Sequence, residues 1–468
     1  MARTNRRWER APVAFKDLRA FLKKIEAADT LVRVKKEVDF DQEISAAIIK
    51  AGAAALFCEK VKGYDIPVVA NLFADRRKIE LALALQTKNP IEEYLKRLEK
   101  LKPPRLVRDG PVKENIVTGN KLDIPAALPI PVVNEKDGGR YISSGIIVAK
   151  DPEYGYNLAL HRLQIKGKNR AGIYMSELQH LHLYYKRAEE RNEPLEIAVV
   201  IGCDPSLYLA SVVTGPPDLD EYAVAGALRG APVETVKCKT VDLMAPAHAE
   251  IVLEGKILPH KREPEGPFGE FSKYYGPQGN RPVVEFTALC HRDRPLYQTI
   301  YLGRRQRDNV FLTSLPKAAD LYRAAKEVAP EVKDVYLTPG GCGRYHAVIS
   351  MKKMFEGEPK LVLSVVLAHR IGVKHAIVVD EDIDIYDPHE VEWAMATRFQ
   401  FDRDSFFLND TPIHLDPSSA FKRKTGLLTS KLGMDATLPL DVAYPQVCDV
   451  SKEVMKKVED NWQRYLEG

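Results

Sequence analysis

The sequence has no run of about 18 consecutive apolar residues, the length that a membrane-spanning helix requires. Its first residues, MARTNRRWER, lack the apolar core of a secretory signal. The six cysteines are scattered singly and form no C-x-x-C pair, so neither a zinc cluster nor a redox dithiol is expected. Isolated cysteines of this kind are typical of reduced, mostly buried thiols. We therefore expect a cytoplasmic protein with no membrane segment.

A large excess of charge is also missing. The 69 Lys and Arg residues nearly balance the 65 Asp and Glu residues, which leaves a formal net charge of +4 over 468 residues. Proteins that bind nucleic acid usually carry a larger and more clustered cationic excess, so no nucleic-acid partner is expected. We interpret the basic run of Arg3, Arg6, Arg7 and Arg10 as a solvated tail.

Several well-known site motifs are absent as well. No Walker loop, G-x-G-x-x-G, H-E-x-x-H or G-x-S-x-G pattern stands in a convincing context. The acidic run of Asp380, Asp382 and Asp384 fails as a calcium loop, because Ile385 stands where glycine is needed and Val391 where glutamate is needed.

What is present predicts an α/β (α+β) protein of about three domains, at roughly 150 residues per domain. Hydrophobic residues make up 45% of the chain, which is enough for sizeable cores. Helical spacing near Phe15, an alternating strand over Thr30–Val38 and a buried strand in IPVVANLF indicate an N-terminal α/β unit. The proline-rich stretch 101–135 predicts an irregular entry to a second unit.

The middle of the chain favours short strands with few helices, which is typical of a barrel-like domain. A connecting helix is expected over Leu315–Val328, followed by strands at KDVYLTP, YHAVISM, LVLSVV and HAIVVD. Asp387 and Pro388 are a strong signal for the start of a helix. The predicted segments are a tail (1–13), an N-terminal α/β domain (14–110), a central domain (111–312), a connecting helix (313–330), a C-terminal α/β domain (331–440) and a C-terminal helix (441–468).

The most unusual segment surrounds EGPFGEF. Glu265 and Glu270 flank a Gly-Pro pair and a second glycine, which predicts a turn that can bring both carboxylates to one pocket. Phe268 and Phe271 supply apolar walls of the kind that raise the pKa of a carboxyl group by desolvation. A carboxyl group tuned in this way can donate a proton near neutral pH. The alternative is a surface turn with two solvated glutamates.

Polar residues interrupt an otherwise apolar strand at NLALHRLQ, residues 157–164. Arg162 is suited to hold a substrate carboxylate through two parallel hydrogen bonds, although a structural salt bridge explains it equally well. Asn157 and Arg162 face opposite sides of a regular strand, so one site can use both only if the strand bulges or the site wraps its edge.

A second set of polar side chains stands at expected helix starts. His180 lies off the buried stripe of one helix, and Glu221 begins another. Together with Asn157 they form an oxygen and nitrogen set that suits Mg²⁺ or Mn²⁺ better than zinc. Each of these residues alone is unremarkable.

At these positions the chain strongly resembles the UbiD family of decarboxylases, which use prenylated FMN. EGPFGEF, EIVLEGKILP, EYAVAGALRGAPVETVKC, NLALHRLQ, DEDIDIYD and SKLGMDAT look like family signatures and follow the family order. The resemblance implies an N-terminal α/β domain, a central split β-barrel related to flavin reductases, and a C-terminal α/β domain. It also implies a homodimer or a higher homo-oligomer in which the C-terminal helix is exchanged between subunits.

The resemblance further implies a bound prenylated FMN, supplied by a flavin prenyltransferase. A Mn²⁺ (or Mg²⁺) ion at its phosphate would be held by Asn157, His180 and Glu221. A K⁺ ion would be bound partly by the backbone around Ala210, Ser211 and Val213. The remaining cofactor-lining positions would be Ala159, Leu160, His161, Arg162, Gln179 and, at the phosphate, Lys431.

By the same resemblance, the catalytic residues would be Arg162, Glu265 and Glu270. Arg162 would orient the carboxylate of a small conjugated acid and pair with Glu265. The modified flavin would form a cycloadduct with the substrate, CO₂ would leave, and Glu270 would protonate the remaining carbon. The protein would supply position and protons while the cofactor supplies the hard step. His161 stands where many relatives have tyrosine, and neither its role nor that of His346 follows from the sequence.

Other functions remain open at this point. The substrate is an aromatic, heteroaromatic or α,β-unsaturated acid in the first hypothesis, and a phosphorylated unsaturated acid of the anhydromevalonate phosphate type in the second. Arg304, Arg305 and Arg307 would favour the phosphorylated substrate, unless they are surface residues. A glycoside hydrolase with a carboxylate pair and a non-catalytic flavin-binding protein are the alternatives from other classes.

Overall fold

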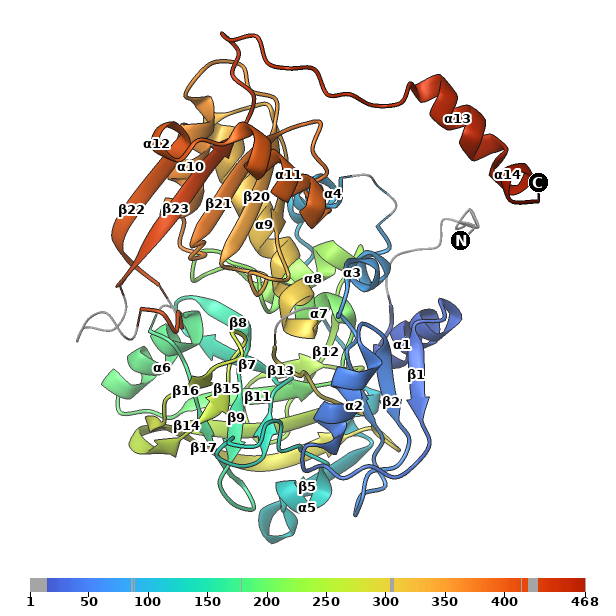
Figure 1. Ribbon diagram of the computed structural model, residues 1–468. Coiled ribbons are helices and arrows are strands. Elements are labelled where there is room, and N and C mark those ends of the chain that lie inside the picture. The colour runs from blue at the N-terminus through green and yellow to red at the C-terminus, as the bar shows by residue number, and fades with distance from the viewer. Residues whose placement is uncertain are drawn as a thin grey trace.

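The computed structural model describes residues 15–85, 87, 89–177, 179–303, 307–413, 415–419 and 428–467. It is a mixed α/β protein, in which a strand-rich central region lies below the C-terminal region and beside the N-terminal region (Figure 1). The predicted tail 1–13 and the residues Arg304 and Arg305 lie outside the described residues. Within the described residues, no helix combines the length and the apolar character needed to cross a bilayer.

The N-terminal region contains a four-stranded mixed sheet in the order β1-β2-β3-β18. Its last strand comes from far along the chain, so residues that follow the central sheet complete the N-terminal one. The strands are β1 (Leu31–Val34), β2 (Ala55–Cys58), β3 (Val68–Ala70) and β18 (Tyr297–Gln298), and the helices are α1 (Leu18–Ala27), α2 (Glu43–Ala51), α3 (Arg76–Leu83) and α4 (Pro90–Leu98).

The central region is built on a nine-stranded sheet, and its main path runs β6-β9-β10-β17-β14-β11-β7-β8, with β5 paired to β17. The strands are β5 (Asn115–Thr118), β6 (Tyr141–Ile142), β7 (Ile146–Asp151), β8 (Gly155–Leu160), β9 (Leu163–Ile165), β10 (Arg170–Ile173), β11 (Leu195–Ile201), β14 (Ile251–Glu265) and β17 (Gly279–His291). Smaller sheets are formed by β4 (Arg105–Leu106), β12 (Glu234–Lys237) and β13 (Met244–Pro246), and by β15 (Phe268–Gly269) with β16 (Tyr275–Gly276).

This sheet has to curl strongly. β8 lies at one end of the path and β9 next to the other end, yet only residues 161 and 162 separate them in the chain. Three peptide steps span about 11 Å at most, so the two ends of the sheet meet at this connection. No pairing between β6 and β8 closes the path among the described residues, and full closure into a split barrel remains a prediction.

Three helices lie around the central sheet and carry predicted site residues. They are α6 (His180–Glu190), α7 (Pro205–Ala210) and α8 (Glu221–Arg229), and a short helix α5 (Ile124–Ala127) also belongs to this region. The expected short helix of EYAVAGAL is α8, which Asp220 caps at its start and Gly230 ends in the left-handed conformation.

The long helix α9 (Asp308–Val328) joins the central region to the C-terminal one (Figure 1). It contains the helix expected over Leu315–Val328 but begins seven residues earlier. The expected start lies beside Pro316, a residue typical of a first turn, whereas in the structure this proline stands inside the helix. Asp308 provides the acidic residue that favours the true first turn.

The C-terminal region is a five-stranded sheet in the order β19-β20-β21-β23-β22, covered by helices. Asp387 caps α11 as predicted, because its carboxylate accepts a hydrogen bond from the His389 N–H at 2.8 Å. The elements are β19 (Val332–Leu337), β20 (His346–Met351), β21 (His375–Asp380), β22 (Ser405–Pro412), β23 (Leu428–Ala436), α10 (Glu358–Ala368), α11 (Pro388–Arg398) and α12 (Phe401–Asp404).

The strand expected at LVLSVV was wrong, because these residues form the middle of α10. Its buried side chains, Val362, Leu363, Val366 and Leu367, recur at helical spacing. The β-branched residues favour a strand locally, but burial of one helical face against β21 and β23 overrides that preference. Pro359 in the first turn supports the helix.

The chain ends in α13 (Lys452–Asp460) and α14 (Trp462–Glu467), which extend away from the rest of the molecule (Figure 1). Neither helix has a buried residue, although Val454, Met455, Trp462 and Leu466 are large and apolar. Exchange of this segment between subunits remains a prediction.

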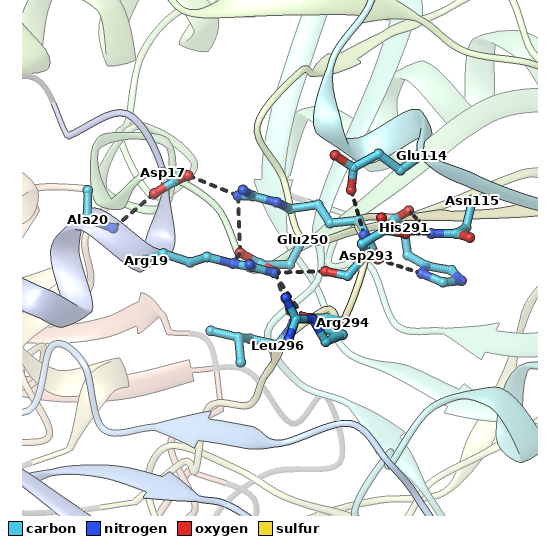
Figure 2. A network of polar contacts seen from close by, with 11 residues as sticks. Asp17, Arg19, Ala20, Glu114, Asn115, Glu250, His291, Asp293, Arg294 and Leu296 are labelled. Carbon is cyan, nitrogen blue, oxygen red and sulfur yellow. Dashed lines mark hydrogen bonds and ion pairs between the residues drawn. The ribbon is translucent and has the colours of Figure 1, made fainter.

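A partly buried ion-pair cluster, here called the Glu250 cluster, joins α1 to the central sheet (Figure 2). The Arg19 guanidinium donates two hydrogen bonds to the Glu250 carboxylate, both at 2.9 Å. Arg292 donates to Glu250 at 3.3 Å and to Asp17 at 2.9 Å, and the Leu296 N–H donates to Glu250 at 3.1 Å. Two guanidinium groups therefore balance two carboxylates between segments more than 200 residues apart.

Candidate active site

The turn after β14 is shaped by glycine and held by two distant side chains. Glu265 is the last residue of β14, and Gly266 follows with φ +95°, a conformation that favours glycine. The Gly266 N–H donates to the Gln164 side chain at 3.0 Å, and the Gly269 N–H donates to Asp137 at 2.8 Å. Both backbone groups are thus fixed, and the glutamates on either side of the turn are held in place.

Arg162, Glu265 and Glu270 form one buried cluster, here called the Arg162 cluster. The guanidinium of Arg162 donates hydrogen bonds from Nε and Nη2 to the Glu265 carboxylate, at 3.0 and 3.1 Å. Its Nη1 donates a further hydrogen bond to Glu270. The side chains of Arg162, Glu265 and Glu270 are 8%, 0% and 9% exposed. The structure therefore brings together the three residues that the sequence proposed for catalysis, with one cation shared between two carboxylates.

Aromatic rings surround this cluster. The carbon at the centre of the Arg162 guanidinium lies 4.5 Å from the ring centroid of Tyr174 and 4.8 Å from that of Phe268. Phe268 in turn contacts Tyr141, with ring centroids 4.5 Å apart. Burial, and then the nearby Glu265 carboxylate, raises the pKa of Tyr141. Such walls keep the guanidinium in a fixed position and exclude water from the carboxylates.

Arg162 reaches this cluster because it does not lie within a regular strand. β8 ends at Leu160 and β9 begins at Leu163, so Arg162 stands in the connection where the two ends of the curled sheet meet. The strict alternation that would separate Asn157 from Arg162 therefore stops before Arg162. Such an interruption is a condition for one site to use both residues, and their use by one site stays a prediction.

His161 is buried in the same connection. Its Nδ1 lies 3.2 Å from the Tyr174 carbonyl oxygen, which can only accept, so Nδ1 carries the proton. Burial lowers the pKa of His161 to about 4, and the ring is neutral at physiological pH. Its Nε2 is an acceptor that has no hydrogen-bond partner among the described residues.

A second polar group lies where β8 meets α8. The Asn157 side-chain amide donates to Glu221 at 3.0 Å, and the Leu158 N–H donates to the other Glu221 oxygen at 2.9 Å. Desolvation raises the pKa of Glu221 to about 8. Burial, followed by the charge of Arg370, lowers the pKa of His180, the first residue of α6.

The side chains of Asn157 and Glu221 are suited to hold a divalent cation. The Asn157 carbonyl oxygen is buried without a partner in the described residues, beside the carboxylate of Glu221. An amide oxygen and a carboxylate are donors suited to Mg²⁺ or Mn²⁺, and the predicted participation of the His180 imidazole stays a prediction. No cluster of three or more His, Cys, Asp or Glu side chains able to hold a metal occurs in the described parts of the chain. A site here therefore depends on Asn157.

The other predicted cofactor residues are described by their own elements, and their grouping with Asn157 and Glu221 remains a prediction. Ala210 ends α7, the Val213 N–H donates to its carbonyl at 3.1 Å, and Ser211 is buried beside it. Gln179 precedes α6, and Ala159 and Leu160 are half-buried at the end of β8. Lys431 on β23 is buried, which lowers its pKa, and it donates to the Leu367 carbonyl and not to another predicted site residue.

Sequence reasoning missed several residues that the structure places at the Arg162 cluster. Gln164 lies in the singled-out NLALHRLQ segment, so its polar side chain in an apolar strand was the available signal. Tyr174 and Asp137 come from other elements, and no local pattern distinguishes them.

Three family domains match almost the whole chain. They are the N-terminal, Rift-related and C-terminal domains of 3-octaprenyl-4-hydroxybenzoate carboxy-lyase (UbiD), over residues 22–98, 105–305 and 310–436. The anhydromevalonate phosphate decarboxylase of Methanothermobacter thermautotrophicus is 37% identical over 428 residues, which cover 90% of this chain and 97% of that protein.

Solved structures agree with this match over nearly the full length. The UbiD-class enzyme HmfF of Pelotomaculum thermopropionicum, in complex with FMN, has a TM-score of 0.89 at 43% identity, covering 94% of this chain and 98% of HmfF. The vanillic acid decarboxylase of Sedimentibacter hydroxybenzoicus has a TM-score of 0.83 at 32% identity, covering 97% and 100% of the two chains. The chain therefore belongs to the UbiD family and is a UbiD-class decarboxylase.

Proposed function

We propose that the protein catalyses the reversible, non-oxidative decarboxylation of an aromatic, heteroaromatic or α,β-unsaturated carboxylic acid with prenylated FMN. The observation that carries this proposal is the sharing of one buried guanidinium, that of Arg162, between Glu265 and Glu270. The binding of FMN by HmfF supports the cofactor. When bound, the modified flavin supplies an electron sink for the carbon that loses CO₂.

Arg162 orients the substrate carboxylate in this proposal. Glu265 occupies two N–H groups of the guanidinium and fixes its plane, which leaves the Nη1 edge, where Glu270 lies, for exchange with a carboxylate. The rings of Tyr174 and Phe268 hold the guanidinium from its faces. A carboxylate bound at that edge lies directly beside the Glu270 side chain.

Glu270 is the proposed proton donor. Arg162 neutralises one of the two carboxylates, so the second one carries a proton when the cluster is neutral overall. The carbon–carbon bond to CO₂ breaks, its electron pair stays on the substrate carbon, and the Glu270 proton forms the new C–H bond. A proton from solvent then restores the acid. In the carboxylation direction Glu270 accepts the same proton.

Asn157, His180 and Glu221 are the proposed ligands of a Mn²⁺ or Mg²⁺ ion at the cofactor phosphate, with Lys431 as a further phosphate contact. The backbone around Ala210, Ser211 and Val213 is proposed to bind K⁺. The unpartnered Asn157 oxygen supports the divalent site. We also propose a homodimer or a higher homo-oligomer, because α13 and α14 expose apolar residues that a second subunit can cover.

A second substrate class has specific support. The curated relative at 37% identity is a decarboxylase of anhydromevalonate phosphate, so a phosphorylated unsaturated acid is the second candidate.

The test is expression together with a flavin prenyltransferase, followed by a visible absorption spectrum and measurement of CO₂ release over a panel of conjugated acids. The proposal expects flavin absorption and release from at least one acid in the panel. A protein that carries the cofactor but releases no CO₂ from any acid, phosphorylated ones included, would instead be a flavin-binding protein without this activity.

A further inference from the structure

Two phenylalanines flank the proposed proton donor, and the structure gives them different neighbours. Phe268 lies two residues before Glu270 and is fully buried, whereas Phe271 directly follows Glu270 and is half-buried. The sequence treated both rings as apolar walls of one pocket. In the structure, Phe268 contacts Arg162 and Tyr141 within the central region. Phe271 has its aromatic and cationic contacts elsewhere.

Phe271 packs against the C-terminal region of the chain. The carbon at the centre of the Arg344 guanidinium lies 4.8 Å from the Phe271 ring centroid. The ring centroid of Tyr345 lies 5.5 Å from that of Phe271, with the two planes 47° apart. Arg344 and Tyr345 stand in the loop between β19 and β20. A cation over an aromatic face and a tilted pair of rings are both favourable contacts, so Phe271 joins the catalytic turn to this loop.

The loop that receives Phe271 is fixed on two sides. The Tyr345 carbonyl oxygen accepts hydrogen bonds from the N–H groups of Lys374 and His375, at 2.8 and 2.9 Å, where β21 begins. A Cβ atom at Gly343 would lie 2.7 Å from the Val310 carbonyl oxygen, so the loop also packs closely on α9. The loop is therefore able to hold the Phe271 ring in a constant place.

Glu270 belongs to a short hairpin that two regions hold from outside. Within the hairpin, the Glu270 N–H donates to the Tyr274 carbonyl at 2.9 Å, and the Lys273 N–H donates to the Glu270 carbonyl at 2.8 Å. The Lys273 ammonium donates to the Asn134 side chain at 3.1 Å, which ties the hairpin to the central region. Phe271 ties it to the C-terminal region. Its Cα lies about 3.8 Å from that of Glu270, so its place directly limits where the acid can move.

We propose that Phe271 is a positioning residue, which holds Glu270 in place for proton transfer by anchoring the turn to Arg344 and Tyr345 of the C-terminal region. This inference rests on the proposed function and deepens it. A misplacement of about 1 Å at a reacting group can cost about 10²-fold in rate. Binding of the substrate carboxylate should not depend on the same anchor, because Glu265 ends β14 and Arg162 directly precedes β9, both in the central sheet.

The experiment separates kcat from KM for CO₂ release by the flavin-loaded enzyme, on the acid of the panel that it decarboxylates fastest. Phe271→Leu removes the ring and should lower kcat by about tenfold to 100-fold, with KM and FMN affinity within about twofold of the wild type. Tyr345→Leu should lower kcat as well. The double variant should be no slower than the slower single variant, because both substitutions remove the same contact. Phe271→Tyr keeps the ring and should retain most of kcat.

Phe407→Leu is the matched control, because Phe407 lies on β22 of the C-terminal sheet but is 61% exposed, and it should leave kcat unchanged. The thermal midpoint is measured for every variant, and kcat is counted per folded, flavin-loaded molecule. This count separates a misplaced acid from a smaller amount of folded enzyme.

A kcat of Phe271→Leu near that of the wild type would overturn the proposal, and so would a loss that Tyr345→Leu does not share. An equal loss in Phe271→Tyr would show that the ring contact is not the cause. A raised KM with unchanged kcat would make Phe271 a substrate contact and also overturn the positioning role. A wild type that releases no CO₂ from any acid would overturn the proposed function and this inference with it, whereas an active wild type with unaffected variants overturns the inference alone.

Discussion

The Glu250 cluster and the Arg162 cluster both pair arginine with buried carboxylates, but they differ in their balance of charge. In the Glu250 cluster, Arg19 and Arg292 face Glu250 and Asp17, and a backbone N–H completes the bonds of Glu250. In the Arg162 cluster, one guanidinium faces Glu265 and Glu270. The first is electrically complete, whereas the second keeps a place for a proton or a substrate charge.

This difference in charge balance indicates that the same residue types serve two purposes. The Glu250 cluster connects α1 to the residues that follow β17 (Figure 2). Among the described residues, no cation–π contact involves its two guanidinium groups. The Arg162 cluster lies at the seam of the curled sheet, between aromatic rings, on a turn held by Gln164 and Asp137. We infer that the first cluster stabilises the fold and that the second is kept incomplete for the reaction.

The largest expected effect is on activity. Glu270→Gln keeps the shape of the side chain but removes the acid, so decarboxylation should fall by at least about 10³-fold, in the range of lost general acid catalysis. Bound cofactor and the thermal midpoint should change little. CO₂ release per bound flavin is the measurement, and release at the wild-type rate would show that Glu270 is not the donor.

Glu250→Gln should have the opposite profile. It leaves Arg19 and Arg292, whose side chains are 35% and 14% exposed, with the charge of Asp17 alone, and the lost hydrogen bonds to a charged group cost about 1.5–3 kcal/mol of stability. The thermal midpoint should drop, while CO₂ release per folded, flavin-loaded molecule stays near that of the wild type. Glu114, whose carboxylate accepts an exposed hydrogen bond from the Asp293 N–H at 2.6 Å, provides the control, and Glu114→Gln should cost roughly 1 kcal/mol or less. A drop in the specific activity of Glu250→Gln without a drop in its stability would contradict a structural role for the Glu250 cluster.

The stability of the region around the Arg162 cluster should also depend on pH, because His161 directly precedes Arg162. The pKa of His161 is about 4 in the fold and 6.5 in the unfolded chain, so the unfolded state binds the extra proton more readily. Stability is therefore complete above about pH 6.5 and is lost as pH falls toward 4, by up to roughly 3 kcal/mol from this residue. His161→Gln should weaken that acid-side loss in urea unfolding at pH 4.5 relative to pH 7. An unchanged pH profile would mean that the histidine is not held neutral.

The smallest expected effects come from lysine in place of arginine. Arg19→Lys loses the paired hydrogen bonds to Glu250 and should cost about 1 kcal/mol, with normal activity. Arg162→Lys should be similarly mild for thermal stability but should raise KM and lower kcat, because one ammonium cannot hold Glu265 and a substrate carboxylate in a fixed plane. Equal catalytic losses in both variants would remove the distinction between the clusters.

Local sequence was informative where a short segment determines its own geometry. The turn at EGPFGEF follows from its glycines and proline, and the start of α11 follows from Asp387 and Pro388. The grouping of Glu265 and Glu270 was therefore within reach of sequence reasoning. The strand predicted at LVLSVV failed because burial against a sheet, which no local pattern contains, decided in favour of α10.

Long-range pairing was the part that local patterns could not supply. The position of Arg162 depends on the short connection between β8 and β9, which lie near opposite ends of one sheet path. The resemblance to a family supplied the role of Arg162, whereas its place in this connection came from the structure. Residues such as Tyr174 and Asp137 matter only through such contacts.

The most direct test of the central claim follows the proton itself. The decarboxylated product is incubated with flavin-loaded enzyme in D₂O, and proton NMR follows exchange at the carbon that carried the carboxylate. If Glu270 exchanges its proton with that carbon, the wild type should introduce deuterium there, and Glu270→Gln should not, with both proteins binding the product. Exchange at equal rates in the two proteins would contradict the account.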